Sequence, residues 1–201
     1  MRSLLLSVTV LLSSCASTSI PPDFRFGPQT AQALVVGSIT YDSALGAYSV
    51  SATSRDGGSV FRAKVGYSTW PPLGPEFDDA LKKKGGTFAV AITPGQYTLQ
   101  RWEIRQGEMV FAAARPIGLV FKADAGQITY LGNFHFDKNG DVALSDQAAR
   151  DLPILQTRFP AAALTAPAHA IPAGARLERI GNNPGGRIDD RFYTLSLVPA
   201  P

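Results

Sequence analysis

Between Leu34 and Leu144 the sequence alternates apolar and polar residues with a period of two, and this pattern constrains the fold more than any other feature. Alternation of this kind places one face of a β-strand in a core and the other in water. The segments are short and are separated by turn residues such as Pro94-Gly95 and Asn139-Gly140. They predict a mainly β fold, an antiparallel β-sandwich of about 7–9 strands with one or two short helices.

One segment changes parity within its length. Its apolar residues lie at Tyr97 and Leu99 and then at Trp102 and Ile104. A bulge with one extra residue would return all four side chains to the same face. We therefore expect this strand to bend between residues 99 and 102.

Two segments are predicted to be helical. In residues 76–84 acidic residues precede three lysines, which complements a helix dipole, and Gly85 follows as a stop signal. In the second segment Ser145 can cap the helix. Its apolar side chains fall on one face at Ala148, Leu152, Leu155 and Phe159. Pro153 requires either that Asp151 starts a new first turn or that the helix kinks.

The amino end has the layout of a secretory signal, with Arg2 followed by the apolar run Leu4 to Leu12. This run falls short of the roughly 20 apolar residues that span a bilayer. Leu12-Ser13-Ser14-Cys15 resembles the lipobox of bacterial lipoproteins, in which the cysteine thiol receives a diacylglyceryl group and the preceding bond is cut. The alternative is an ordinary signal with an incidental cysteine, because Ser14-Cys15-Ala16 also passes as a cleavage site.

The lipobox resemblance implies an exported chain that acyl groups on Cys15, its single cysteine, attach to a membrane. By the sorting pattern of such lipoproteins, Ala16 in place of aspartate favours the outer membrane, facing the periplasm. No disulfide can form within the mature chain, so packing must hold its fold. We expect a signal peptide at 1–14, a tether at 15–33, the β domain at 34–160, an Ala/Pro-rich linker or loose strap at 161–175, and a terminal hairpin or tail at 176–201.

A second resemblance concerns the fold. Pro94-Gly95-Gln96-Tyr97-Thr98-Leu99 resembles a motif of transthyretin-like and carboxypeptidase-regulatory-like sandwiches, where a Pro-Gly turn leads into a strand that begins with tyrosine. Together with the lipobox, the glycine-bounded segment 126–132 and Arg150-Asp151-Leu152, it makes the chain look like uncharacterised bacterial outer-membrane lipoproteins with such a domain. The resemblance covers residues 34–160 and implies a fold without implying an activity.

Sequence motifs give no catalytic residue, metal site or cofactor. Asp137-Lys138-Asn139-Gly140-Asp141 offers oxygens to calcium, but its glycine is misplaced for an EF-hand. A hairpin turn with Asn139 and Gly140 at positive φ is the favoured interpretation. His135 shares the polar parity of Thr129 and Asn133 and is predicted to be a surface residue, as is His169.

Other charged residues are also interpreted as ordinary surface groups. The adjacent pairs Asp78-Asp79 and Asp189-Asp190 cannot converge as glycosidase carboxylates do, so we expect solvated charges. Lys82 to Lys84 could meet anionic headgroups, but three lysines at a helix end are more often a solvated cap. A net charge of +3 with 17% charged residues argues against a nucleic-acid partner.

The candidate partner-binding residues are Trp70, Pro71, Pro72 and Leu73, a large aromatic in a stiff loop that could dock an envelope protein at little entropic cost. Alternatively, Trp70 folds back to close one end of the sandwich.

The leading hypothesis is a lipid-anchored binding or structural module of the cell envelope without catalysis. The alternative is an envelope hydrolase or carbohydrate-binding subunit whose site is assembled from distant residues; a deep pocket with convergent carboxylates or a His/Asp pair would favour it. A third possibility is a simple structural spacer.

Overall fold

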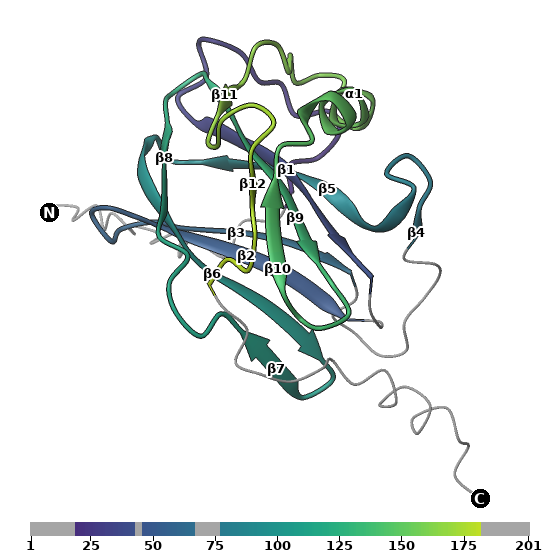
Figure 1. Ribbon diagram of the computed structural model, residues 1–201. Coiled ribbons are helices and arrows are strands. Elements are labelled where there is room, and N and C mark those ends of the chain that lie inside the picture. Colours follow the sequence, from purple (N-terminus) through teal and green to yellow (C-terminus); the bar gives the residue numbers. More distant parts are fainter. Residues whose placement is uncertain (1–18, 43–45, 67–76, 182–201) are drawn as a thin grey trace, which may run out of the picture.

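The computed structural model describes residues 19–42, 46–66 and 77–181, which form two β-sheets and one helix, α1 (Ala148–Arg158) (Figure 1). The larger sheet has seven strands in the order β12-β10-β9-β1-β5-β4, with β11 beside β9. These strands are β1 (Ala33–Tyr41), β4 (Phe77–Asp78), β5 (Lys83–Ile92), β9 (Ile128–Phe136), β10 (Val142–Ser145), β11 (Ala168–His169) and β12 (Arg176–Leu177). The predicted mainly β fold is confirmed.

The smaller sheet has five strands in the order β3-β2-β6-β7, with β8 paired to β6. They are β2 (Ala47–Ser54), β3 (Val60–Gly66), β6 (Gly95–Gln106), β7 (Met109–Ala112) and β8 (Leu119–Ala123). All strand pairs of this sheet are antiparallel. The larger sheet is mixed, because β9 runs parallel to both β1 and β11, so the prediction of a purely antiparallel fold was wrong there. The chain between β1 and β9 includes the whole smaller sheet, and that long excursion makes parallel pairing possible.

The main hydrophobic core lies between the two sheets and takes side chains from both. Aromatic contacts connect the layers: the rings of Tyr41 and Tyr48 stack with centroids 4.0 Å apart, and Trp102 meets Phe136 edge to face at 6.0 Å. The indole N–H of Trp102 donates to the carbonyl oxygen of Ile180 at 2.7 Å. The segment after β12, which belongs to neither sheet, is therefore attached to the core through this hydrogen bond.

The predicted bulge is present in β6. Ser51 of β2 lies opposite Arg101, whereas the next residue, Ala52, lies opposite Leu99, so Gln100 is the extra residue. Because of this insertion, the apolar residues on both sides of the bulge face the same core.

A second bulge, in β9, was not predicted. Val36 pairs with Tyr130, but Ser38 pairs with Asn133, and Gly132 has a φ of +110°. Strict period-two alternation in the sequence predicts that the even-numbered apolar residues of 128–136 share one face, and the bulge shows this prediction to be wrong. Ile128 and Tyr130 face helix α1, and Phe134 and Phe136 face the core between the sheets.

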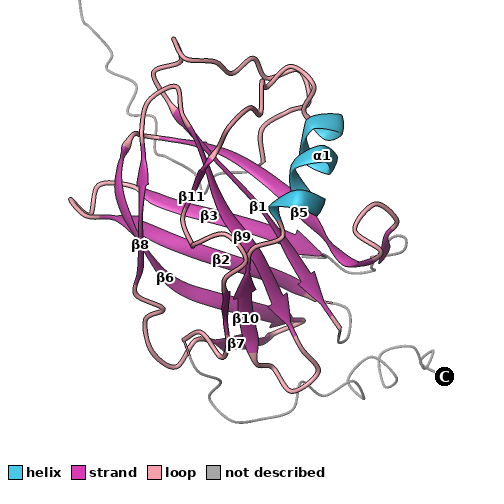
Figure 2. Ribbon diagram, turned by 45° about the horizontal axis from the view of Figure 1, so that its top comes forward, coloured by secondary structure: helices cyan, strands magenta, loops and turns pink. Residues whose placement is uncertain are grey.

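Helix α1 covers the outer face of the larger sheet, forming a third layer (Figure 2). Leu155 and Phe159 pack there with Leu34 and Val36 of β1 in a second hydrophobic cluster. Pro153 lies inside one continuous helix, so of the two alternatives the new start at Asp151 is excluded.

The amino-terminal segment 19–33, expected to belong to the tether, packs onto the same face. Ile20 and Phe26 are buried, and the Ile20 N–H donates to the carbonyl oxygen of Ala89 on β5 at 2.7 Å. Residues 161–175 are likewise a packed strap and not a free linker, since Leu164 and Ile171 are buried and β11 pairs with β9.

The predicted helix at 76–84 was wrong, because this segment forms the β4–β5 hairpin. Asp78 Oδ1 accepts the backbone N–H groups of Ala80 and Leu81 and closes the turn. Leu81 is buried, and β5 continues directly into pairing with β1. At the carboxyl end β12 pairs with β10, while residues 182–201 of the predicted terminal hairpin or tail lie outside the described residues.

Candidate functional site

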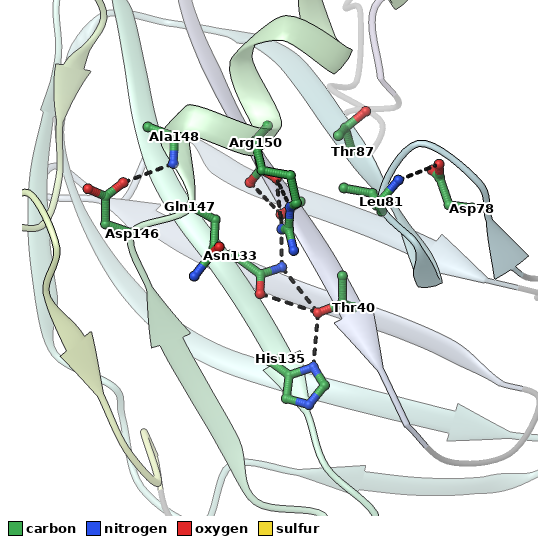
Figure 3. A network of polar contacts seen from close by, with 12 residues as sticks. Thr40, Asp78, Leu81, Thr87, Asn133, His135, Asp146, Gln147, Ala148 and Arg150 are labelled. Carbon is green, nitrogen blue, oxygen red and sulfur yellow. Dashed lines mark hydrogen bonds and ion pairs between the residues drawn. The ribbon is translucent and has the colours of Figure 1, made fainter.

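A ladder of polar side chains crosses the outer face of the larger sheet beside helix α1 (Figure 3). Strand β1 supplies Ser38 and Thr40, and Asp42 follows at the next outward position. Their inward neighbours belong to the core between the sheets, so strand geometry itself aligns these polar groups on one face. From β9 come Asn133 and His135, which the bulge at Gly132 turns toward the same face.

The buried end of the ladder is Asp151, whose side chain has no exposed surface. Its carboxylate accepts the hydroxyl protons of Ser38 at 2.6 Å and Tyr130 at 2.7 Å. Arg150 completes the set with Nη2 at 2.7 Å from Asp151 Oδ1. Burial, reinforced by the Asp151 charge, raises the pKa of Tyr130, so this phenol remains a hydrogen-bond donor at neutral pH.

Ser38 is fully used as a hydrogen-bonding group. It donates to Asp151 and accepts from Arg150 Nη2 at 3.1 Å and from Asn133 Nδ2 at 2.8 Å. A hydroxyl has one proton and two lone pairs, so no capacity is left for another ligand.

The outer end of the ladder reaches solvent. His135 Nδ1 lies 2.9 Å from Thr40 Oγ1, and His135 Nε2 lies 3.1 Å from Asp42 Oδ2. Lys83 Nζ approaches Asp42 Oδ1 at 3.4 Å. Burial alone would raise the pKa of Asp42, but its electrostatic and hydrogen-bonding contacts with His135 and Lys83 together outweigh burial and lower this pKa.

Thr40, His135 and Asp42 are the residue types of a nucleophile, a base and an orienting acid, brought together from positions about 95 residues apart. The arrangement does not suit catalysis, because Thr40 has no exposed surface and a nucleophile must reach its substrate. Both ring nitrogens of His135 are also engaged. We interpret the ladder as a structural link between α1, β1 and β9.

A second polar contact fixes the start of α1. Asp146 Oδ1 accepts the Ala148 N–H at 3.0 Å, and Asp146 Oδ2 accepts the Gly174 N–H of the strap at 2.8 Å. These two backbone donors hold the pKa of Asp146 below its usual value. The predicted cap, Ser145, is instead the last residue of β10. His169 lies with Nδ1 4.0 Å from Asp146 and its ring against Tyr130.

We expect Asp146→Ala to lower the free energy of unfolding by roughly 1–2 kcal/mol, because a helix-start donor and a strap donor both lose their acceptor. Since the folded pKa is lowered, the wild-type advantage should be present above the pKa of an unfolded aspartate and should vanish as pH falls through the folded value. Urea unfolding across that range measures it. Ala149→Ser, at the exposed second residue of the helix, is the control, and an Asp146→Ala protein as stable as wild type would contradict the assignment.

The calcium alternative for Asp137–Asp141 finds no support in the geometry. Asp137 Oδ1 accepts the backbone N–H groups of Asn139 and Asp141 at 2.8 and 2.9 Å, as expected of a hairpin turn. Gly140 has a φ of +78°, but Asn139 is not at positive φ, so that detail of the prediction was wrong. Within 19–42, 46–66 and 77–181, no cluster of three metal-binding side chains occurs.

The remaining charged and loop residues singled out in the sequence have three different outcomes. Asp78 is not a solvated charge, because its Oδ2 pairs with Arg158 Nη2 at 2.6 Å and 9% of its side chain is exposed. Lys83 and Lys84 begin β5 in the β4–β5 hairpin. Cys15, the loop residues Trp70, Pro71, Pro72 and Leu73, and the pair Asp189-Asp190 lie outside the described residues.

A shallow depression of about 340 Å³ lies beside the Pro94-Gly95 turn. The one carboxylate that lines it, that of Asp56, accepts hydrogen bonds from the Ser54 hydroxyl and the Gly58 N–H. The Tyr97 hydroxyl donates to the Thr93 carbonyl at 2.8 Å and fixes the turn. This depression therefore lacks the convergent carboxylates that a hydrolase would need.

Sequence reasoning missed the polar ladder. A signal was present in Ser38, Thr40 and Asp42, which continue the outward register of an otherwise apolar strand. Asp151 entered the sequence analysis only within Arg150-Asp151-Leu152, part of the resemblance to envelope lipoproteins. Its burial could not be predicted, because it depends on where α1 docks.

No protein-family model and no curated protein matches this chain. Among solved structures, it is similar to a leucine-rich repeat protein from Bacteroides thetaiotaomicron VPI-5482, with 13% identity and a TM-score of 0.29. The match covers 52% of this chain and 14% of that one, and a likeness this weak carries no argument. No helix among the described residues is long and apolar enough to cross a bilayer.

Proposed function

We propose that this chain is a lipid-anchored module of the bacterial cell envelope, tethered through Cys15 to the outer membrane and facing the periplasm. The Leu12 to Cys15 segment after a short apolar run carries this proposal. The packing of Ile20 adds support, because a folded domain that begins so soon after Cys15 suits a chain whose mature form starts at that residue. The membrane is then its first partner, through the lipid.

The fold we propose for the module is a transthyretin-like β-sandwich. Its support is a hydrophobic core shared by two facing sheets and the Pro94-Gly95 turn, which leads from β5 in one sheet to β6 in the other. The Tyr97 hydroxyl bond to Thr93 gives the tyrosine of the motif a role in holding that turn.

Binding without catalysis is the activity that the described residues favour. Two His/Asp pairs are on the side of a hydrolase. The enclosed Thr40 beside the His135–Asp42 pair weighs against that function. In the other pair His169 is 4.0 Å from Asp146, whose carboxylate already accepts two backbone N–H groups. We retain Trp70, Pro71, Pro72 and Leu73 as the proposed docking loop for an envelope protein.

The deciding experiment is metabolic labelling with a palmitate analogue in a Gram-negative host. Wild-type protein is expected to take up label and to fractionate with the outer membrane, and Cys15→Ser should lose the label completely because serine has no thiolate. Ser13→Ala, which keeps a small residue near the cysteine, is the matched control and should keep the label. Unlabelled wild-type protein would refute the anchor.

A further inference from the structure

The outer face of the smaller sheet carries a cluster of positive side chains. Arg62 and Lys64 project from β3, and Arg101 and Arg105 project from β6, across the hydroxyls of Ser49 and Ser51 on β2. About half of each arginine side chain is exposed, at 43%, 51% and 52% for Arg62, Arg101 and Arg105. We call these four cations the basic face.

One acidic side chain, Glu103, lies within the basic face. Its carboxylate is 3.9 Å from Arg62, 3.8 Å from Arg101 and 3.3 Å from Arg105. Four cations against one anion leave a charge of 4 − 1 = +3 on this face, equal to the net charge of the entire chain. Partial burial lowers the pKa of Lys64, and the nearby positive charges of Arg62 and Arg105 lower it further.

Exposed valines border the basic face on the same side of the sheet. Val60 is 61% exposed on β3, Val110 is 43% exposed opposite Arg105, and Val120 is 49% exposed on β8. Their neighbours Phe61, Phe111 and Phe121 point into the core, so the valines point outward. Apolar side chains around cations suit a bilayer surface, where valines can enter the interface while ammonium and guanidinium groups meet phosphates.

The length of chain behind the anchor lets this face reach a membrane. The Ser19 hydroxyl donates to the carbonyl oxygen of Ala89 on β5. Strand β5 faces β3 across the core, where the ring centroids of Phe61 and Phe88 lie 6.1 Å apart. The four steps from Cys15 to Ser19 span at most about 14 Å, and the smaller sheet lies about 10 Å below the larger one. An anchored domain can therefore turn either its α1 side or the smaller sheet toward the lipid, and the excess charge selects the basic face.

We propose that the basic face docks on the anionic headgroups of the membrane that holds the protein, so that the module lies flat on the bilayer. This inference rests on the proposed anchor for its biological setting, but the binding chemistry stands without the lipid. The occupant is a lipid surface that carries phosphate charge.

The test is co-sedimentation with vesicles of phosphatidylcholine alone or with phosphatidylglycerol added. All variants are made in the full chain with Cys15→Ser, so that acyl groups do not mask the contact and the amino end is constant. Binding is expected only with phosphatidylglycerol. Ser51→Glu and Lys64→Gln should each lower the partition coefficient about fivefold, and the double variant about 25-fold, at roughly one charge unit each.

Matched controls separate charge from structure. Ser51→Gln matches the size of the Ser51→Glu side chain without its charge, and Lys64→Arg keeps the positive charge. Both should bind as the parent does, as should Lys138→Gln in the distant β9–β10 turn. If only Lys83→Gln and Lys84→Gln weaken binding, or if the parent does not bind, the proposal is overturned. Palmitate labelling tests the anchor separately, so failure of the proposed anchor and failure of the proposed docking can be distinguished.

Discussion

Replacing Asp151 by alanine is expected to lower the free energy of unfolding by about 3–5 kcal/mol, the range for breaking a buried charge pair. Three donors lose their acceptor together: the hydroxyls of Ser38 and Tyr130 and the guanidinium of Arg150. Tyr130 and Ser38 have no access to water in compensation, since both are fully buried. Chemical denaturation followed by circular dichroism measures the loss.

Two further variants show whether the ladder acts as a unit. Asp151→Asn keeps size and one acceptor oxygen and should lose less than alanine does. Ser38→Ala and the double variant with Asp151→Ala complete a cycle whose coupling energy should be about 0.5–3 kcal/mol. Additive effects within error, or a stable Asp151→Ala protein, would show that the ladder does not hold α1 on the sheet.

Strand positions could be predicted from the sequence because alternation reports local exposure. The same logic found the bulge in β6, where four large apolar residues on one strand require a common core. The same logic failed in β9, because apolar residues occur at both odd and even positions around Gly132. Only the docking of α1 decides which face of the sheet each of them occupies. Without that third layer, Tyr130 and Phe134 look equivalent.

The β4–β5 hairpin shows why charge order alone misleads. Acids followed by lysines complement a helix dipole, but Asp78 instead closes a turn and pairs with Arg158, 80 residues away. A Cβ on Gly85 would lie 2.1 Å from the Ile39 carbonyl oxygen, so this glycine permits close strand approach and does not end a helix. Long-range contacts of this kind leave no local pattern in the sequence.

The candidate site was partly accessible to prediction for the same reasons. His135 shares a polar face with Asn133, as predicted, but the bulge turns Thr129 to the other face. Its partners Thr40 and Asp42 come from another strand, joined through a parallel pairing that alternation does not specify. The basic face was missed because its cations are spread singly over two strands, and only the register across β2 brings them together.

Trp102→Ala is expected to destabilise the protein by about 3–5 kcal/mol, the usual cost of removing a buried aromatic side chain. Trp102 is 1% exposed, packs edge to face on Phe136, and donates its indole N–H to the Ile180 carbonyl. The last contact ties the segment after β12 to the smaller sheet, together with the bond from the Arg115 N–H to Gly181. Hydrogen exchange of amides near residue 180 should therefore accelerate along with the global loss.

Trp102→Phe isolates the hydrogen bond from the packing. It keeps most of the buried ring area but leaves the Ile180 carbonyl without its donor, so a smaller loss of roughly 1–2 kcal/mol is expected. The accelerated exchange near residue 180 should persist in this variant, because the tie itself is gone. If Trp102→Phe protects that segment as wild type does, the indole bond does not anchor the chain end and packing alone holds it.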